Sequence, residues 1–170
     1  MPRRTASPFA PLLAPALALA LVACGPTGMS GPSMNNRMGS SSTTATATDT
    51  VESTEILDRE PRANATKVKH ILVSWKDKEA RDPRGQARTK REAEREVRSL
   101  LKQIAAGADF ELLMNEHSED FGSAATGDAY DVAPDAGLVI EFRQLGLRLD
   151  VGEVGVVESD FGFHIMKRVE

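Results

Sequence analysis

The sequence contains little that could crosslink the chain or direct it to nucleic acid. Cysteine occurs once among the 170 residues, so no disulfide can form within the chain. The formal net charge is only −4 at pH 7, which gives no electrostatic reason to expect a nucleic-acid partner. Aromatic residues make up 5% of the chain, no internal repeat is visible, and 41% of the residues are hydrophobic. This composition fits one modest domain with additional segments.

A hydrophobic run long enough to span a membrane comfortably is also missing. The apolar stretch at residues 9–22 follows two basic residues, Arg3 and Arg4, but it is short and is broken by Pro11 and Pro15. This arrangement is typical of a signal peptide rather than of a transmembrane helix.

The apolar stretch ends in Leu-Val-Ala-Cys-Gly at residues 21–25, which resembles the lipobox of bacterial lipoproteins. In that family the signal is cut before the cysteine, whose thiol and new amino group are acylated. The resemblance implies a signal peptide at residues 1–23, lipidation of Cys24 and an extracytoplasmic protein anchored in a bacterial membrane. Gly25 provides no acidic retention signal, which favours the outer membrane facing the periplasm. The alternative is an ordinary secretory signal with an incidental cysteine.

Residues 24–64 are rich in Ser, Thr, Gly, Ala and Asn and follow neither a helical nor a strand period. Such a segment cannot bury enough apolar surface to fold, so we predict a flexible tether that begins at the lipidated cysteine. About 40 residues of flexible coil reach roughly 35 Å, enough to hold a domain clear of a bilayer. We include residues 51–59 in the tether, although a short helical turn could form there. A glycosylated stalk is an alternative.

We expect the folded domain at residues 65–170, beginning with a strand at residues 67–75 that carries His70. A polar loop follows. Thr89 then caps a helix whose apolar residues recur at helical spacing and which ends near Gly107. Asp109 caps a second helix, whose apolar face includes His117 as a packing residue.

The second half of the domain is predicted to contain a turn-rich segment, a short strand, a short helix and a closing strand pair. These lie at residues 118–128, 129–132, 139–147 and 155–169. In the closing pair, Gly162 leaves room for a close approach to the sheet.

The predicted order is β-α-α-β-α-β-β, which is an α+β domain with helices packed around a small, largely antiparallel sheet. One histidine in a strand is weak evidence of a site. His70 and His164, however, lie in the first and last strands, so the two imidazoles can meet if those strands pair.

The domain resembles the parvulin peptidyl-prolyl isomerases from residue 68 to residue 169. The motifs that carry the resemblance are Val-Lys-His-Ile-Leu-Val at 68–73, Gly-Ala-Asp-Phe at 107–110, His-Ser-Glu-Asp at 117–120 with Ser-Ala at 123–124, Gly-Asp at 127–128, Phe142, Val-Gly-Glu-Val at 151–154 and Phe-Gly-Phe-His-Ile at 161–165. The resemblance implies a parvulin-like four-stranded sheet with three helices. It also implies a peptidyl-prolyl cis-trans isomerase that assists the folding of extracytoplasmic proteins, acting on unfolded or nascent proline-containing polypeptides.

Carried over residue by residue, the resemblance implies a catalytic network of four side chains. The family's paired histidines correspond to His70 and His164. Asp120 takes a position that holds cysteine in some parvulins and aspartate in many bacterial ones, and Ser159 matches a hydroxyl-bearing position of the same network. The alternatives are that the histidines serve only the fold and that Asp120 is a turn residue or helix cap.

The resemblance also implies an apolar cup that receives the proline ring. Leu138 and Phe142 are its expected residues, with Met166 as a neighbour and Ala129 in one wall. In the family, leucine and glycine and then an aromatic residue follow the Gly-Asp motif. Ala129 and Tyr130 stand there instead, so one wall loses bulk or is rebuilt.

Isomerisation of an X-Pro bond needs no nucleophile, metal or cofactor, because its barrier of about 18–20 kcal/mol comes from the loss of amide resonance. A dry apolar cup favours the twisted amide. A carboxylate near the carbonyl oxygen, which we assign to Asp120, further disfavours the planar, charge-separated form. Two histidines and an aspartate are also the ligand types of a facial metal triad, but we predict neither a metal nor a cofactor.

Alternatives from other functional classes remain open. The departures from the family pattern leave a catalytically weak, parvulin-like module that holds unfolded segments as a tethered chaperone. A lipoprotein with a purely structural role would show neither turnover nor peptide binding. Phosphate-selective parvulins carry a basic cluster in the loop equivalent to residues 76–91, so acidic or phosphorylated substrates are an alternative to our interpretation of a solvated loop.

Overall fold

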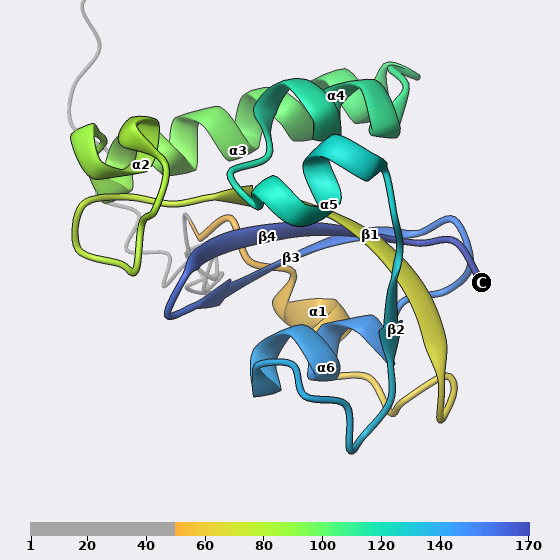
Figure 1. Cartoon of the computed structure of the whole chain (residues 1–170). Helices are drawn as coiled ribbons and strands as arrows, with labels where there is room; N and C mark the ends of the chain where they lie inside the picture. Colours follow the sequence, from red (N-terminus) through yellow and green to blue (C-terminus); the bar gives the residue numbers. More distant parts are fainter. Residues whose placement is uncertain (1–49) are drawn as a thin grey trace, which may run out of the picture. The chain divides into compact units, whose positions relative to one another are not determined.

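The sheet of this domain places the first and last strands side by side (Figure 1). The computed structural model describes residues 50–170. There, β1 (Thr66–Val73) pairs with β4 (Gly162–Arg168), β2 (Tyr130–Val132) lies outside β1, and β3 (Val154–Ser159) lies outside β4. All pairings are antiparallel, in the order β2-β1-β4-β3. The predicted α+β class and four-stranded sheet are confirmed.

The register of β1 against β4 decides which side chains share a face of the sheet. His70 lies opposite Met166, and Leu72 lies opposite His164. Side chains alternate between the two faces along a strand, so these four residues share one face while Ile71 points to the other. The two histidines are therefore diagonal neighbours on the same side of the sheet.

Each face of the sheet is covered by helices and has its own core (Figure 1). α3 (Lys90–Ala105) and α4 (Phe110–His117) cover one face, and α6 (Ile140–Gly146) covers the other. The core under α3 and α4 includes Ile71, Val73, Val97, Leu100, Met114, Phe163 and Ile165. The core under α6 includes Val68, Val132, Phe142, Leu145, Val157 and Met166. The histidine face is thus the face that α6 covers.

The predicted helix signals act as expected. The Thr89 amide donates to Glu92 Oε2 at 2.8 Å and its hydroxyl accepts from the Glu92 amide at 3.4 Å, which completes the capping box. Gly107 has a φ of +91° just past the end of α3. The Asp109 carboxylate accepts the first free amides of α4.

The prediction of three helices is incomplete, because the described residues contain six. The additional helices are short: α1 (Thr54–Leu57), α2 (Pro83–Ala87) and α5 (Phe121–Thr126). Asp82 caps α2 and Asp120 caps α5. Helices this short depend on caps and tertiary contacts rather than on apolar periodicity, so their sequences carry little signal. None of the helices in this part of the chain could cross a membrane.

Gly162 allows β4 to begin directly against the end of β1. Its φ is +136°, and a Cβ at this position would lie 2.6 Å from the carbonyl oxygen of Val73. We predicted that Gly162 leaves room for a close approach. The group that makes this approach is the backbone at the end of β1. This contact fixes the start of the strand that carries His164.

The folded unit begins before the predicted boundary at residue 65. The edge of β3 would otherwise expose unpaired backbone groups, and residues 52 and 53 satisfy them. Ser53 donates its amide to the Val156 carbonyl and accepts the Val156 amide on its hydroxyl, both at 2.9 Å. Glu52 accepts the Glu158 amide at 3.1 Å. The last part of the predicted tether is thus part of the domain.

Ile56 anchors this N-terminal segment in the core under α6. It is 4% exposed. A Cβ added at Gly155 would lie 3.2 Å from its Cδ1 atom, so glycine at that position of β3 makes the space that Ile56 occupies.

We expect Ile56→Ala to lower the free energy of unfolding by about 2–5 kcal/mol, because it empties a buried site. Glu55→Ala, on the exposed side of the same helix, is the matched control and should change stability by less than about 0.5 kcal/mol. Denaturant unfolding of the full chain measures both. Equal stability of the two variants would show that the segment is not part of the folded unit.

Candidate active site

Two buried imidazoles meet on the face of the sheet that α6 covers. His70 and His164 are each 4% exposed, and their Nδ1 atoms are 3.0 Å apart. The ring planes differ by 15° and the centroids are 5.2 Å apart. The expected meeting of the two histidines is confirmed.

Both imidazoles continue into a row of hydrogen bonds. Nε2 of His164 lies 2.7 Å from Ser159 Oγ, and Nε2 of His70 lies 2.9 Å from Asp120 Oδ2. The backbone N–H of Phe161 donates to Ser159 Oγ at 3.1 Å. The structure therefore brings the four predicted network residues together in the order Ser159, His164, His70, Asp120.

With both imidazoles neutral, this row has one self-consistent direction. An ionised Asp120 can only accept, so His70 carries its proton on Nε2 and accepts on Nδ1. His164 then donates from Nδ1 and accepts the Ser159 hydroxyl proton on Nε2. Every donor in the row points toward Asp120, which favours cooperative strengthening of the bonds.

Asp120 receives two further donors besides His70. The Tyr130 hydroxyl lies 2.6 Å and the Ser123 hydroxyl 2.8 Å from the same oxygen, Oδ2. The hydrogen bond from His70, followed by those from Tyr130 and Ser123, holds the pKa of Asp120 well below its usual range, although burial acts in the opposite direction. The carboxylate is therefore ionised at neutral pH.

A cavity of about 370 Å³ opens beside this row. Phe142 and Leu138, the predicted cup residues, line it together with His70, His164 and Asp120. Phe142 stands edge-on to both imidazoles, with centroid distances of 5.1 and 5.3 Å. Further apolar lining comes from Leu72, Val139, Phe121 and Phe161. The ionised end of the network, Asp120, thus borders a largely apolar space of the size of a small ligand.

Two predicted substrate-binding residues do not line this cavity. Met166 shares the histidine face but is fully buried, because α6 closes over it at Gly146, where a Cβ would lie 3.3 Å from Met166 Cε. Ala129 borders a shallower hollow together with Ser123. We therefore correct the predicted placement of both residues: Met166 is a core residue, and Ala129 lies beside the site.

Tyr130 and Ser123 belong to the site but were not predicted as site residues. The ring of Tyr130 stands edge-on to His70, with a centroid distance of 5.2 Å and an interplanar angle of 87°. The sequence feature that could have identified Tyr130 is its position in a short predicted strand, where the family pattern has glycine. Ser123 follows Asp120 by three residues, which places its hydroxyl in the first turn of the helix that Asp120 caps.

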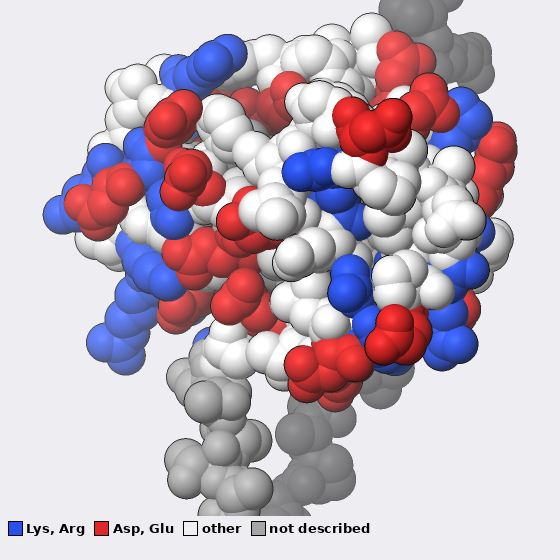
Figure 2. Space-filling model, turned by 90° about the horizontal axis from the view of Figure 1, so that it is seen from below, with Lys and Arg blue, Asp and Glu red and all other residues white. Residues whose placement is uncertain are grey.

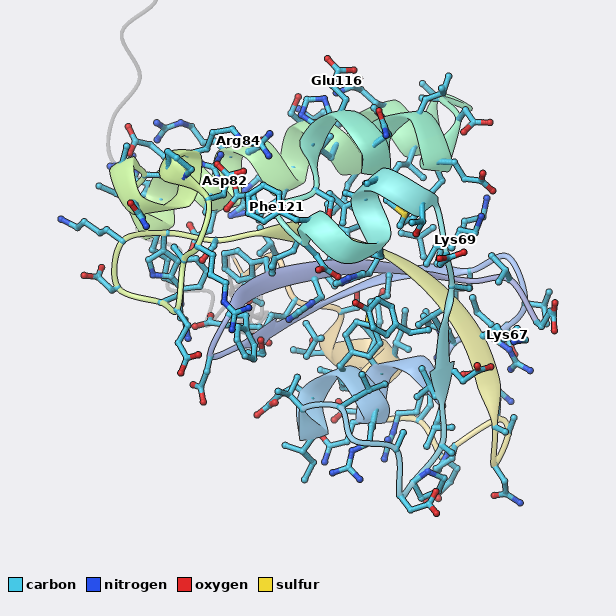
Figure 3. The ribbon with its side chains drawn as sticks, viewed as in Figure 1. Lys67, Lys69, Asp82, Arg84, Glu116 and Phe121 are labelled. Carbon is cyan, nitrogen blue, oxygen red and sulfur yellow. The ribbon has the colours of Figure 1, made fainter. Side chains whose placement is uncertain are left out.

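Most basic side chains of residues 76–91 are paired within the domain. Arg84 contacts Asp82 at 2.8 Å (Figure 3), and Arg88 binds the buried carboxylate of Glu119. Lys78 and Lys90 share the carboxylate of Glu158. Among the described carboxylates, none pairs with Arg81, which lines the cavity. On the face seen in Figure 2, basic and acidic side chains are interspersed.

The facial metal triad considered from the sequence does not fit this geometry. The two Nδ1 atoms face each other, and Nε2 of His70 faces Asp120, so these atoms are directed at protein partners rather than at a common ligand position. Within residues 50–170, no group of three or more His, Cys, Asp or Glu side chains could hold a metal ion.

A paired-histidine network beneath an apolar cavity, on a four-stranded antiparallel sheet, defines a parvulin-like domain. The family model for the PPIC-type PPIASE domain matches residues 53–170. The peptidyl-prolyl isomerase ESS1 from Candida albicans has the same fold, with a TM-score of 0.56 and 23% identity over 63% of each chain. The chain belongs to the PPIC-type peptidyl-prolyl isomerases, the parvulin family.

Two curated relatives are longer proteins. Chaperone SurA of Alkalilimnicola ehrlichii is 34% identical over 107 residues, which are 62% of this chain and 23% of SurA. Foldase protein PrsA of Geobacillus kaustophilus is 35% identical over 75 residues, which are 44% of this chain and 27% of PrsA. The similarity therefore spans about a quarter of the length of these relatives.

The buried row predicts an acid-sensitive fold. Burial, followed by the proximity of His70, lowers the pKa of His164 well below its ordinary value of 6.5. Below pH 6.5 the unfolded chain binds a proton at this residue that the folded chain does not. The free energy of unfolding therefore rises as the pH approaches 6.5, and above pH 6.5 this residue no longer lowers it. We expect the free energy of unfolding to fall between pH 6.5 and 5, by at most about 1.4 kcal/mol per pH unit from this residue.

Urea unfolding at several pH values measures this dependence. In His164→Gln, the free energy of unfolding should depend less on pH between pH 6.5 and 5. Val157→Ala removes bulk from the residue directly opposite His164 on β3, so it should lower stability but keep the slope. An unchanged slope in His164→Gln would contradict the assignment.

Proposed function

We propose that this domain catalyses the cis-trans isomerisation of X-Pro bonds. The observation that carries the proposal is the apolar cavity in which Phe142 and Leu138 lie beside an ionised, firmly held Asp120. A proline ring is an apolar group that such a cavity can take up. The two isomers differ by only about 0.5–1 kcal/mol, so the site has only to lower the barrier between them.

The cavity and the carboxylate would act on the two ends of amide resonance. The planar amide is charge-separated and gains from solvation by water, whereas the twisted amide has less charge separation. Exclusion of water by Phe142 and Leu138 therefore favours the twisted form. The negative charge of Asp120 near the carbonyl oxygen disfavours the planar form further. No covalent intermediate is needed, and His70 and His164 serve to orient the carboxylate.

We propose proline-containing unfolded polypeptides as the substrates. The support is the similarity to proteins named as a chaperone and a foldase, SurA and PrsA. Because this chain matches only about a quarter of either protein, binding of long unfolded segments has to be tested apart from turnover.

We also propose that the chain is a lipoprotein. The predicted signal peptide at residues 1–23 and the predicted lipidation at Cys24 lie outside the described residues. Since residues 51–64 belong to the folded domain, the proposed tether runs from Cys24 to about residue 50. A flexible coil of that length reaches roughly 28 Å. The proposed location is the periplasmic face of a bacterial outer membrane.

Phe142→Ala should lower kcat/KM for a proline-containing peptide by roughly 10- to 100-fold, because the cup loses its main wall. Leu145→Ala is the matched control: Leu145 lies in the same helix and core but does not line the cavity, so the folded variant should keep its turnover. Exchange spectroscopy of the peptide measures turnover without a coupling protease. Peptide binding without turnover by the unmodified chain would support the alternative of a binding module.

Asp120→Asn tests the electrostatic part of the same prediction. A loss of roughly tenfold or more in kcat is expected when the charge is removed. Full activity of a stably folded Asp120→Asn variant would exclude a role for the negative charge.

Cys24→Ser should abolish incorporation of labelled palmitate and release the chain from the membrane fraction of a bacterium that processes lipoproteins, because acylation needs the thiol. Met29→Leu, which lies just beyond the acylated position, should behave as the unmodified chain. Membrane attachment that survives Cys24→Ser would rule out the lipid anchor.

A further inference from the structure

Tyr130 is the only tyrosine in the chain, and it reaches the candidate active site from the edge strand β2. Its register against β1, opposite Val68, sets it beside the strand that carries His70. Its hydroxyl donates to Asp120 Oδ2 at 2.6 Å, the shortest of the bonds that this carboxylate accepts.

The donors to Asp120 are distributed unequally between its two oxygens. Oδ2 accepts from His70, Ser123 and Tyr130, whereas the one donor to Oδ1 within residues 50–170 is the Gly122 amide at 3.3 Å. A carboxylate has about four lone-pair sites, so Oδ2 is fully engaged while Oδ1 keeps acceptor capacity. Asp120 lines the cavity, and its side chain is 25% exposed.

The Tyr130 ring holds its hydroxyl in a fixed place. It packs edge-on against His70 and also against Phe142, at a centroid distance of 5.7 Å. A tyrosine ring has few rotatable bonds, so a hydroxyl held in this way is positioned more firmly than one on a mobile side chain.

We propose that Tyr130 is a positioning residue for Asp120: its hydroxyl keeps Oδ2 turned into the protein and leaves Oδ1 as the oxygen available to a bound peptide. This inference rests on the proposed isomerase function. It assigns a polar role to the position at which the chain departs from the parvulin pattern.

The titratable groups around Asp120 are compatible with this role. His70 faces it from β1 and Tyr130 from β2, while His164 on β4 stands behind His70. Burial, and then the hydrogen bond to Asp120, raise the pKa of Tyr130 to about 12. The phenol therefore remains a donor across the neutral and mildly alkaline range.

The test is Tyr130→Phe in the full chain, which removes the hydroxyl and keeps the ring. We expect kcat for the proline peptide to fall about tenfold with KM nearly unchanged, as for the loss of one hydrogen bond to a charged acceptor. The ¹³C resonance of the Asp120 carboxyl should titrate at higher pH in the variant. Asp131→Asn, on the same strand but paired with Lys67 at the surface, is the matched control and should change neither quantity.

A folded Tyr130→Phe variant with unchanged kcat and an unchanged Asp120 titration would overturn the proposal. If the unmodified chain shows no turnover, the proposed function fails, and the Asp120 titration alone decides whether Tyr130 positions the carboxylate. Should Tyr130→Phe not fold, fluorotyrosine labels this one position in the unmodified chain. Its ¹⁹F resonance should move on Asp120→Asn; a resonance that stays in place would also overturn the proposal.

Discussion

His70 and His164 share a hydrogen bond in the interior of the domain, at the point where its first and last strands pair. A buried polar atom without a partner costs about 1–3 kcal/mol, so the ring nitrogens constrain how these strands can meet. Slippage of one strand by one residue would turn one imidazole to the opposite face, among Ile71 and Ile165. The interaction that forms the centre of the site therefore also specifies the central strand pairing of the fold.

The row of hydrogen bonds changes character along its length. At Ser159 and His164 it is buried and neutral, and at Asp120 it reaches the cavity as an ionised group. The buried end has no solvent to rearrange, so its hydrogen-bond directions persist. The fixed end determines how His70 presents its Nε2 proton, which provides one of the three hydrogen bonds that hold Asp120 Oδ2.

Helices and strands could be predicted from the sequence where they depend on neighbouring residues or on a periodic pattern. The capping box at Thr89 depends on residues three apart. Residue patterns and the resemblance to the parvulins placed His70 and His164 in two strands whose pairing would bring the imidazoles together. Prediction failed where distant residues decide the structure. Ile56 and its neighbour Leu57 are two apolar residues in an otherwise polar stretch, and the site that receives Ile56 lies about a hundred residues further along the chain. Short helices such as α5 depend on a cap and on packing, for which single-sequence patterns carry little information.

The errors within the site have the same origin. Alternation places Met166 on the correct face, but only the approach of α6 at Gly146 decides that it is covered. The family pattern left two interpretations of Ala129 and Tyr130, a wall of the cup that loses bulk or a wall that is rebuilt. Because a strand residue contributes to one face only, the identity of Tyr130 as a donor depended on the register of β2, which three residues cannot define in advance.

The departure from the family pattern at Ala129 and Tyr130 bears on the choice between an enzyme and a binding module. The Tyr130 ring packs against His70 and is next in sequence to Ala129, which stands where the family has leucine. Because its hydroxyl donates to Asp120, Tyr130 adds no free polar group to the cavity. A half-buried carboxylate is costly to desolvate, and here three donors to one of its oxygens hold the pKa of Asp120 below its usual range. A module that only holds apolar peptide segments gains nothing from a partly desolvated carboxylate in its cavity. The proposed isomerase does gain from such a charge, because a negative charge near the carbonyl oxygen disfavours the planar, charge-separated amide. The arrangement around Asp120 therefore supports the proposed isomerisation over simple binding.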